Sequence, residues 1–463
     1  MPIAAGYDAT GESQMATSTP VVIVHGPINV NSIRVAGFKS LHDPQKLTFR
    51  PLTILAGANS AGKSSIMQPL LLLKQTLEAP FDPGGILLDG PNVAVSSGDQ
   101  LLTRAGSRKK SDHFSLELLH DDTLVLRLAF APNKRVGLIA TELEYVDDED
   151  SYSLKLDMSP ADVKRQIDKV HSSNRRVWIP QSTNAGESYT VGVERGLLYP
   201  GTRDSASTNS YLSRGYHLPD PAEALKPLTA GLIHVPGLRG NRQASYTKSA
   251  GRAPFTGSFE SYIASILLEW QLADDPRLPL VGEWLGLLGL TWKAEAEQLS
   301  DSQVRINVGR TVVARRGGAK DLVNISQVGF GVSQALPVVV ALLAAENRGL
   351  VYIEQPELHL HPKAQLAMAT LLAKAAANGA RVVIETHSSL LLLQLQTLVA
   401  DGELGRDLVG LNWFSRNEEG FSEVTSANLD EKGSFGSWPE DFDDVSLGAE
   451  RAYIAASEKA MRP

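Results

Sequence analysis

The sequence of 463 residues contains no cysteine, which excludes disulfide bridges, thiolate metal sites and cysteine nucleophiles. It also lacks long hydrophobic runs: runs such as Leu70 to Leu73 and Leu390 to Leu393 are far shorter than a membrane span. The first twenty residues do not place a basic segment before an apolar stretch, so no secretory signal is expected. We therefore expect a cytoplasmic protein with no membrane partner.

Negative charge is concentrated at the C-terminal end of the chain. Residues 401–463 hold 14 acidic and 6 basic side chains, which accounts for the whole net charge of −8. An acidic tail on a neutral body gives no general attraction to nucleic acid. Basic clusters lie at 104–110, 164–176 and 239–252, and a phosphate-binding groove would require two or three of them to converge. The sequence leaves that convergence open.

The length and composition predict a globular chain of two or three packed units. Apolar residues make up 43% and charged residues 21%, which is ordinary for globular proteins. Repeated prolines between 160 and 227 exclude a long coiled coil there and favour an irregular insert. We expect four segments: a flexible leader (1–27), a first lobe (28–158), an accessory insert (159–300) and a second lobe (301–463).

Residues 57–64 read GANSAGKS and fit the P-loop pattern G-x-x-x-x-G-K-[ST]. They lie between an apolar strand at 52–55 and a predicted helix at 64–77, although Pro69 should kink that helix. In this pattern the backbone N–H groups cradle phosphates, Lys63 reaches the β- and γ-phosphates, and the Ser64 hydroxyl ligates Mg²⁺. The predicted nucleotide-binding residues are Gly57, Asn59, Ser60, Gly62, Lys63, Ser64 and Ser65.

Two apolar strands in the C-terminal half each end in residues suited to phosphate chemistry. Residues 350–354 end in Glu354, which suits a Walker B strand beside Mg²⁺. Residues 381–385 are followed by His387, a candidate sensor of the γ-phosphate. Between the P-loop and these strands, the turn at 328–337 opens a helix with glycine, serine and glutamine, and this turn offers N–H groups and a hydroxyl to an anion.

With these motifs in this order, the chain resembles the ABC-type ATPase heads of the SMC, RecF and OLD (overcoming lysogenization defect) clade. More narrowly, it is similar to bacterial AAA-domain ATPases of phage-defence systems. The segments that carry this likeness read GFKS (37–40), HVPGLR (234–239), QPELHLHP (355–362) and SWPEDF (437–442). The resemblance covers roughly residues 30–110 and 230–445. It implies an α/β fold: a two-lobed head with mixed sheets flanked by helices, plus the irregular accessory insert.

The resemblance also implies roles for particular residues. Glu354 would stand with Ser64 at the Mg²⁺ site, residues 358–361 would form a D-loop, and His387 would be the switch histidine. The signature motif would close over ATP bound to a partner subunit. The signature residues are Gly331, Ser333 and Gln334, and the catalytic candidates are Gln355, Glu357 and His387.

Gln355 departs from the clade, most of which has a catalytic glutamate after the Walker B acid. Glutamine can orient a water molecule but cannot take its proton, so we expect slow hydrolysis, or Glu357 or Glu385 as the base. His359 and His361 with Glu357 are also compatible with metal ligation, although the D-loop accounts for all three. The acidic cluster at 440–444 suggests a nuclease site, but the chain after His387 is too short for the nuclease domain of OLD proteins.

The sequence therefore predicts an ATPase that binds ATP and Mg²⁺, oligomerises with ATP between heads, and has no nuclease activity of its own. By resemblance, it would act as a sensor in anti-phage defence and control a separate effector such as a nuclease. Two alternatives stay open. One is a RecF-like DNA-repair clamp that binds DNA ends or gaps, and the other is a scaffold that binds ATP without turnover.

Overall fold

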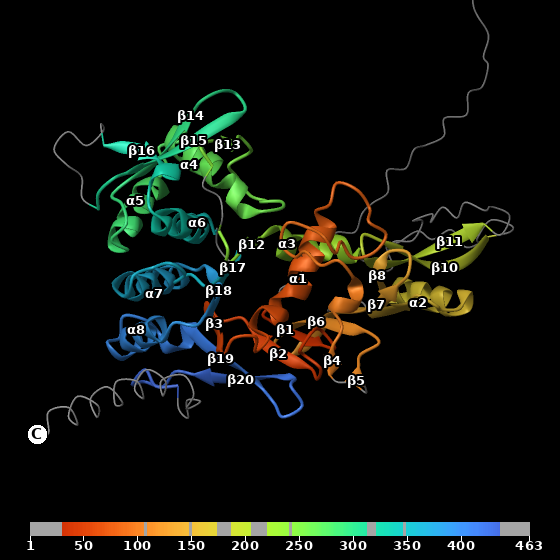
Figure 1. The fold of residues 1–463 in the computed structure, drawn as a ribbon. Coiled ribbons are helices and arrows are strands. Elements are labelled where there is room, and N and C mark those ends of the chain that lie inside the picture. Colours follow the sequence, from red (N-terminus) through yellow and green to blue (C-terminus); the bar gives the residue numbers. More distant parts are fainter. Residues whose placement is uncertain are drawn as a thin grey trace, which may run out of the picture.

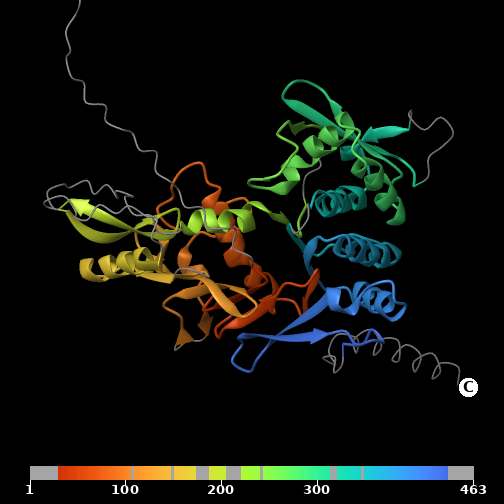
Figure 2. The same cartoon turned by 180° about the vertical axis from the view of Figure 1, so that it is seen from behind.

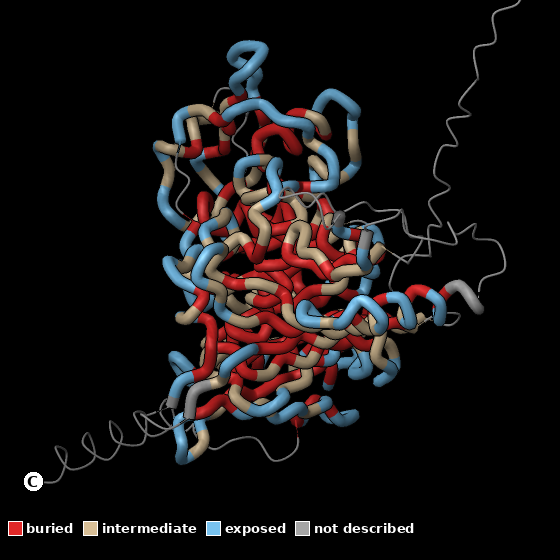
Figure 3. The backbone as a smooth tube through the Cα atoms, turned by 90° about the vertical axis from the view of Figure 1, so that its right-hand side faces the viewer, coloured by how far each residue is buried: buried red, intermediate tan, exposed pale blue. Residues whose placement is uncertain are grey.

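The structure is a computed structural model of the whole chain. It describes residues 30–105, 109–147, 151–173, 187–204, 220–239, 243–312, 321–345 and 349–435. The expected leader at 1–27 and the acidic cluster at 440–444 lie outside these ranges. Figure 3 shows that buried backbone is concentrated in the middle of the molecule and that exposed backbone lies on its outer turns.

A six-stranded sheet forms the centre of the fold, in the order β12-β17-β18-β3-β19-β20. The first five strands run parallel, and only β20 is antiparallel to its neighbour. The P-loop strand thus lies beside the strand that precedes His387, and the Glu354 strand is one position further away. The strands are β3 (Leu52–Gly57), β12 (Leu232–Val235), β17 (Leu350–Glu354), β18 (Arg381–Thr386), β19 (Val409–Arg416) and β20 (Ser422–Asn428).

Both faces of the central sheet are buried, which explains why its strands read as continuous apolar runs. Successive side chains of a strand point to opposite faces. Accordingly, Val351 and Ile353 of β17 join one hydrophobic core, whereas Leu350 and Tyr352 join the other. A strand with an apolar residue at every position can be accommodated only where both faces are covered.

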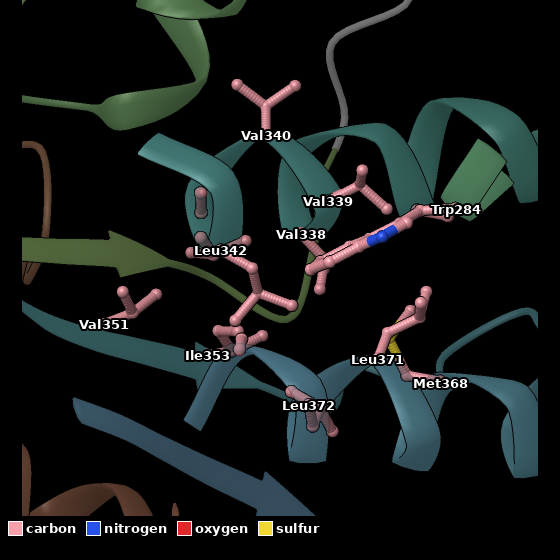
Figure 4. Close-up of a cluster of buried hydrophobic side chains, with 14 of the residues drawn as sticks. Trp284, Val338, Val339, Val340, Leu342, Val351, Ile353, Met368, Leu371 and Leu372 are labelled. Carbon is pink, nitrogen blue, oxygen red and sulfur yellow. The ribbon is translucent and has the colours of Figure 1, made fainter. Parts of the chain in front are cut away.

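Helices cover the first face and stack side by side in Figure 1. Figure 4 shows Trp284 of α5 and Val338 of α6 packed toward Leu371 of α7. A small sheet, β13-β15-β14 with β16 paired to β15, packs beyond them against α4. The helices are α4 (Ile263–Leu272), α5 (Arg277–Leu287), α6 (Phe330–Ala344), α7 (Pro362–Ala377) and α8 (Ser389–Ala400). The small sheet comprises β13 (Tyr246–Thr247), β14 (Ala294–Gln298), β15 (Gln303–Gly309) and β16 (Leu322–Asn324).

The second face packs against α1 (Lys63–Leu77) and an antiparallel sheet in the order β2-β1-β6-β7-β8-β9. Helix α1 runs through Pro69, where proline removes only the bond to the carbonyl four residues earlier. The antiparallel strands are β1 (Ser32–Ala36), β2 (Gln45–Thr48), β6 (Phe114–His120), β7 (Thr123–Asn133), β8 (Gly137–Val146) and β9 (Ser151–Lys155). A short pair, β4 (Arg104–Ala105) and β5 (Lys109–Lys110), lies at one end.

The described residues of the expected insert form regular elements in three different places. Helix α2 (Pro160–Ser173) and the hairpin of β10 (Glu187–Glu194) and β11 (Leu197–Asp204) project to one side of the molecule (Figure 2). Helix α3 (Pro221–Ala230) leads into β12, which pairs with β17 in the central sheet. The remaining elements, α4, α5 and β14, pack with the second lobe. The expected boundaries of the insert, 159 and 300, and of the two lobes stay a prediction.

The α/β fold class with mixed sheets flanked by helices is confirmed. Among the described residues, none of the helices combines the length and the apolar character needed to span a bilayer. The parallel strands β3, β17 and β18 end at the same edge of the sheet, where ligands of open α/β sheets bind. This edge carries the P-loop, Glu354 and His387.

Candidate functional site

The P-loop connects β3 to α1 and has a backbone conformation that depends on its glycines. Gly57 has a φ of 141° and Gly62 a φ of 99°, which side chains strongly disfavour. A Cβ at Gly62 would lie 2.3 Å from Ser422 Oγ and 2.5 Å from Ser40 Oγ. The G-x-x-x-x-G spacing is therefore explained by backbone geometry and by close packing around the loop.

Lys63 is buried and bends back over the loop that it follows. Its Nζ donates to the carbonyls of Gly57 at 3.0 Å and Ala58 at 2.8 Å. Burial lowers the pKa of Lys63, although the negative charges of Glu385 and Glu357 oppose the shift. A phosphate group would offer this ammonium a stronger acceptor than two carbonyls do, so Lys63 is poised to exchange these partners.

The P-loop is also supported by two residues of β19 and β20 that the sequence did not identify as part of the site. The Arg416 guanidinium donates to the carbonyl of Ser60, with its Nε at 3.0 Å. The Ser422 hydroxyl contacts the carbonyl of Ala61 and the hydroxyl of Ser40. Neither position stands in a recognisable motif, because β19 and β20 reach the loop only through sheet pairing. The other predicted loop residues, Asn59 and Ser65, are exposed and buried respectively.

Ser64, the predicted Mg²⁺ ligand, contacts Glu385. Its hydroxyl donates to Glu385 Oε2 at 2.8 Å, and the Tyr352 hydroxyl donates to Glu385 Oε1. Burial, and next the charge of Glu354, raise the pKa of Glu385 to about 7. A hydroxyl and a carboxylate at the end of a P-loop form a donor set of the kind that Mg²⁺ prefers. The residues present therefore fit a Mg²⁺ ion.

Glu354 pairs in register with Glu385, but its carboxylate has other partners. It accepts hydrogen bonds from His234 Nε2 at 3.3 Å and from the N–H of Gly237 at 3.1 Å. Burial alone would raise the pKa of Glu354, but the hydrogen bond and charge of His234, with the Gly237 N–H, lower it overall. The assignment of Glu354 to the Mg²⁺ site stays a prediction.

The three catalytic candidates line one pocket of about 330 Å³. No P-loop residue lines this pocket, but the His387 imidazole interacts with the backbone of Gly57 and with the charge of Lys63. Glu357 Oε1 accepts hydrogen bonds from the Thr386 hydroxyl at 2.8 Å and from the N–H of His387 at 2.9 Å. Gln355 has a φ of 46°, and its N–H donates to the carbonyl of Glu385 at 2.9 Å. Gln355, Glu357 and His387, which the sequence placed together only by analogy, are thus neighbours in space.

Two of these side chains have perturbed pKa values. Burial raises the pKa of Glu357, although its hydrogen bonds oppose the shift. Its second oxygen, Oε2, is buried without a hydrogen-bond partner among the described residues. Burial, and next the charge of Lys63, lower the pKa of His387, so its imidazole is neutral at pH 7. A carboxylate with a raised pKa and an unused oxygen has the properties of a general base.

Arg239 links several of these segments from within the protein. Its side chain is 2% exposed and donates to the carbonyls of Pro236 at 2.9 Å, Gln334 at 3.1 Å and Gln355 at 3.0 Å, and also to that of Glu354. Burial lowers the pKa of Arg239 to about 10, so the guanidinium remains charged at neutral pH. From the sequence, Arg239 stood out only as a member of the family segment 234–239 and of the basic cluster 239–252.

The signature residues lie on the first turns of α6. Ser333 and Gln334 are buried: the Ser333 hydroxyl donates to the carbonyl of Phe330 at 2.9 Å, and the Gln334 amide contacts the carbonyl of Arg239. Gly331 is partly exposed. Phe330 itself is 60% exposed, and its ring centroid lies 6.0 Å from that of His359 in the predicted D-loop. The structure thus places the segment predicted as the signature beside the segment predicted as the D-loop.

The alternative sites receive no support from the described part of the chain. No group of three or more histidine, aspartate or glutamate side chains there is placed to hold a metal. In the basic clusters, Arg239 is buried, Lys164 pairs with Asp168 and Arg252 with Glu269. Arg108, Arg175, Arg176 and Arg242 of these clusters lie outside the described residues.

One protein-family model, described as "AAA domain, putative AbiEii toxin, Type IV TA system", matches residues 227–393. The match covers about a third of the chain and includes Arg239, the signature, Glu354 and His387, but not the P-loop. None of the curated proteins matches the chain at a significant level.

Several solved structures of SMC heads are similar in length and arrangement. An SMC head bound to the C-terminal winged-helix domain of ScpA is 13% identical, with a TM-score of 0.46 over 87% of this chain and 98% of that one. A Pyrococcus furiosus SMC head bound to the C-terminal domain of ScpA is 9% identical, with a TM-score of 0.43 over 86% and 96%. The family match falls on the part of the chain that holds the motifs expected after the P-loop, and over residues 227–393 the chain is similar to this AAA-domain family.

Proposed function

We propose that this protein is a slow, ABC-type ATPase whose heads assemble around ATP and that it regulates a separate effector in anti-phage defence. The observation that carries the proposal is the convergence of the P-loop with Gln355, Glu357 and His387 at one edge of the central sheet. These residues come from three strands that are far apart in the sequence. Their meeting at the end of a P-loop fits phosphate chemistry better than a structural role does.

In this proposal the residues of the site have distinct tasks. Lys63 leaves the carbonyls of Gly57 and Ala58 and binds the phosphates, while the Ser64 hydroxyl and an acidic side chain beside it hold Mg²⁺. Mg²⁺, when bound, neutralises charge on the phosphate oxygens. The Gln355 amide orients a water molecule for attack.

Proton transfer from that water is the step that limits turnover. Because Gln355 cannot accept the proton, the proposed base is Glu357, through its unpartnered Oε2. Glu357 also positions the backbone of His387, whose neutral imidazole senses the γ-phosphate. We expect hydrolysis to be slow because the base is buried and already holds two hydrogen bonds on its other oxygen.

Assembly of two heads is supported by exposed apolar side chains near the signature. Phe330 is 60% exposed and Leu238 is 87% exposed, and Arg239 connects their segments through the Gln334 carbonyl. Burial of these two side chains against a partner would remove apolar surface from water, which favours association. We propose that a second copy covers this surface when ATP is bound, so that Ser333 and Gly331 close over the partner's nucleotide.

The defence role rests on family resemblance. The description of the matched family names a toxin of a type IV toxin–antitoxin system, which supports action together with a second protein. The proposed partner is a separate effector such as a nuclease. A DNA-repair clamp has less support from the described residues, because Arg239 is buried and Lys164 and Arg252 are in ion pairs.

Mass photometry with and without ATP and Mg²⁺, combined with phosphate release, tests the biochemical part of the proposal. We expect the wild-type protein to assemble with ATP and to release phosphate slowly, and Lys63→Ala to do neither. Lys226→Ala, on the exposed surface of α3, is the matched control and should behave as wild type. Rapid turnover of the isolated protein, or a monomer with bound ATP, would contradict the proposal.

A further inference from the structure

Glu385 is the acidic side chain in direct contact with the hydroxyl of the P-loop. It stands near the end of β18, next to the P-loop strand β3, and its side chain is almost fully buried. Both of its hydrogen bonds come from neutral hydroxyls, those of Ser64 at 2.8 Å and Tyr352. The charge of Lys63 also acts on Glu385, but the Lys63 Nζ donates to the carbonyls of Gly57 and Ala58 instead. A buried carboxylate whose own hydrogen bonds come from neutral donors is costly unless a cation accompanies it.

Glu354 is held away from the P-loop hydroxyl by a different set of contacts. His234 donates to its Oε1, and the N–H of Gly237 donates to its Oε2. The carbonyl of Glu354 meanwhile accepts from Arg239. These bonds fix Glu354 to residues 234–239, the segment that ends in the buried Arg239. The contacts of Glu354 therefore stabilise the fold around this segment.

The position of β18 explains why the two acids differ. Because β18 lies between β17 and β3, a side chain at the end of β17 has to reach past β18 to meet the P-loop. Glu385 is paired in register with both Glu354 and Leu55, and so it occupies the intervening position. Neighbouring strands are spaced by about 4.8 Å, so Glu354 starts one strand spacing further from Ser64 than Glu385 does.

We propose that Glu385, and not Glu354, supplies the carboxylate of the Mg²⁺ site, beside the Ser64 hydroxyl. The acid acts on the ion as a ligand or through one of the waters that Mg²⁺ retains. Glu354 then serves as a positioning residue for the segment of His234 and Gly237. This inference rests on the proposed function, since it requires that the P-loop binds ATP with Mg²⁺.

Binding of Mn²⁺, which replaces Mg²⁺ and is visible by electron paramagnetic resonance, tests the assignment in the presence of ATP. The variants are Glu385→Gln and Glu354→Gln, with Glu223→Gln on the exposed surface of α3 as control. We expect Glu385→Gln to weaken Mn²⁺ binding by about tenfold or more. Glu354→Gln and Glu223→Gln should stay within about twofold of the wild type.

A second measurement, binding of a fluorescent ATP analogue in EDTA, separates metal binding from folding and nucleotide binding. Glu385→Gln should keep its metal-free affinity within about twofold, because glutamine retains an acceptor for Ser64. The assignment would be overturned if Glu354→Gln lost Mn²⁺ affinity, or if Glu385→Gln kept it. If Glu385→Gln does not fold, Mn²⁺ binding by Glu354→Gln still tests whether Glu354 is the ligand. A wild-type protein that binds no ATP analogue would instead overturn the proposed function, and this assignment with it.

Discussion

Replacing Arg239 with methionine should destabilise the protein strongly, because one buried guanidinium holds four carbonyl groups in place. These carbonyls belong to Pro236, Gln334, Glu354 and Gln355. Hydrogen bonds from a charged donor contribute about 2 kcal/mol each, so the four together contribute about 8 kcal/mol. Methionine has a similar length and keeps most of the packing.

Part of that contribution is offset by the cost of burying the charge. The fall of the Arg239 pKa from 12.5 to about 10 corresponds to about 3 kcal/mol of unfavourable burial, which methionine would not carry. The net expected loss for Arg239→Met is therefore about 5 kcal/mol. Such a value is at the high end for a single substitution and requires that the freed carbonyls find no new partners.

Urea unfolding followed by tryptophan fluorescence measures this difference, because Trp270, Trp284 and Trp413 lie in the adjoining core. Arg252→Met is the matched control: its side chain is 79% exposed and pairs with Glu269 on the surface, so the loss should be below about 1 kcal/mol. Equal losses in the two variants would refute the reasoning.

Arg239 should also affect assembly, because it joins the Gln355 loop to the signature helix through the carbonyls of Gln355 and Gln334. We expect Arg239→Met to bind the ATP analogue, since the guanidinium makes no hydrogen bond to the P-loop. ATP-dependent assembly, measured by mass photometry, should be lost. Normal assembly of the folded variant would show that the link is only structural.

Three further changes test the site itself. Gln355→Glu should raise phosphate release by about tenfold or more, because it supplies a base at the attacking water; an unchanged rate would place Gln355 elsewhere. Gly62→Ala should weaken binding of the ATP analogue by about tenfold, because a Cβ at this left-handed φ would collide with the side chains of Ser40 and Ser422 and distort the P-loop. An unchanged affinity would show that the P-loop accommodates the Cβ without distortion. Burial lowers the pKa of His387 from its ordinary value of 6.5, so protonation of its imidazole should reduce phosphate release only on the acid side of about pH 6.5, in addition to the loss caused by protonation of Glu357 and Glu385. His387→Gln should lack this additional acid-side loss, and a pH profile of the same shape as that of the wild type would argue against His387.

The sequence was sufficient for those features that depend on local pattern. The glycine spacing of the P-loop follows from the backbone angles that Gly57 and Gly62 adopt, and such angles restrict the residue type directly. The helix expected at 64–77 forms as α1, although Pro69 argued for a kink. The strand expected at 350–354 is β17, because a run of apolar residues is stable only where both faces of a sheet are covered.

The tertiary structure alone decided which side chains meet. Arg416 and Ser422 support the P-loop from strands more than 350 residues away in the chain, and no local pattern marks them. Strand order also decided that Glu385, and not Glu354, contacts Ser64, because β18 pairs with both β17 and β3. Chain-local patterns report torsion angles and burial, whereas the partner of a buried polar group depends on which strands become neighbours.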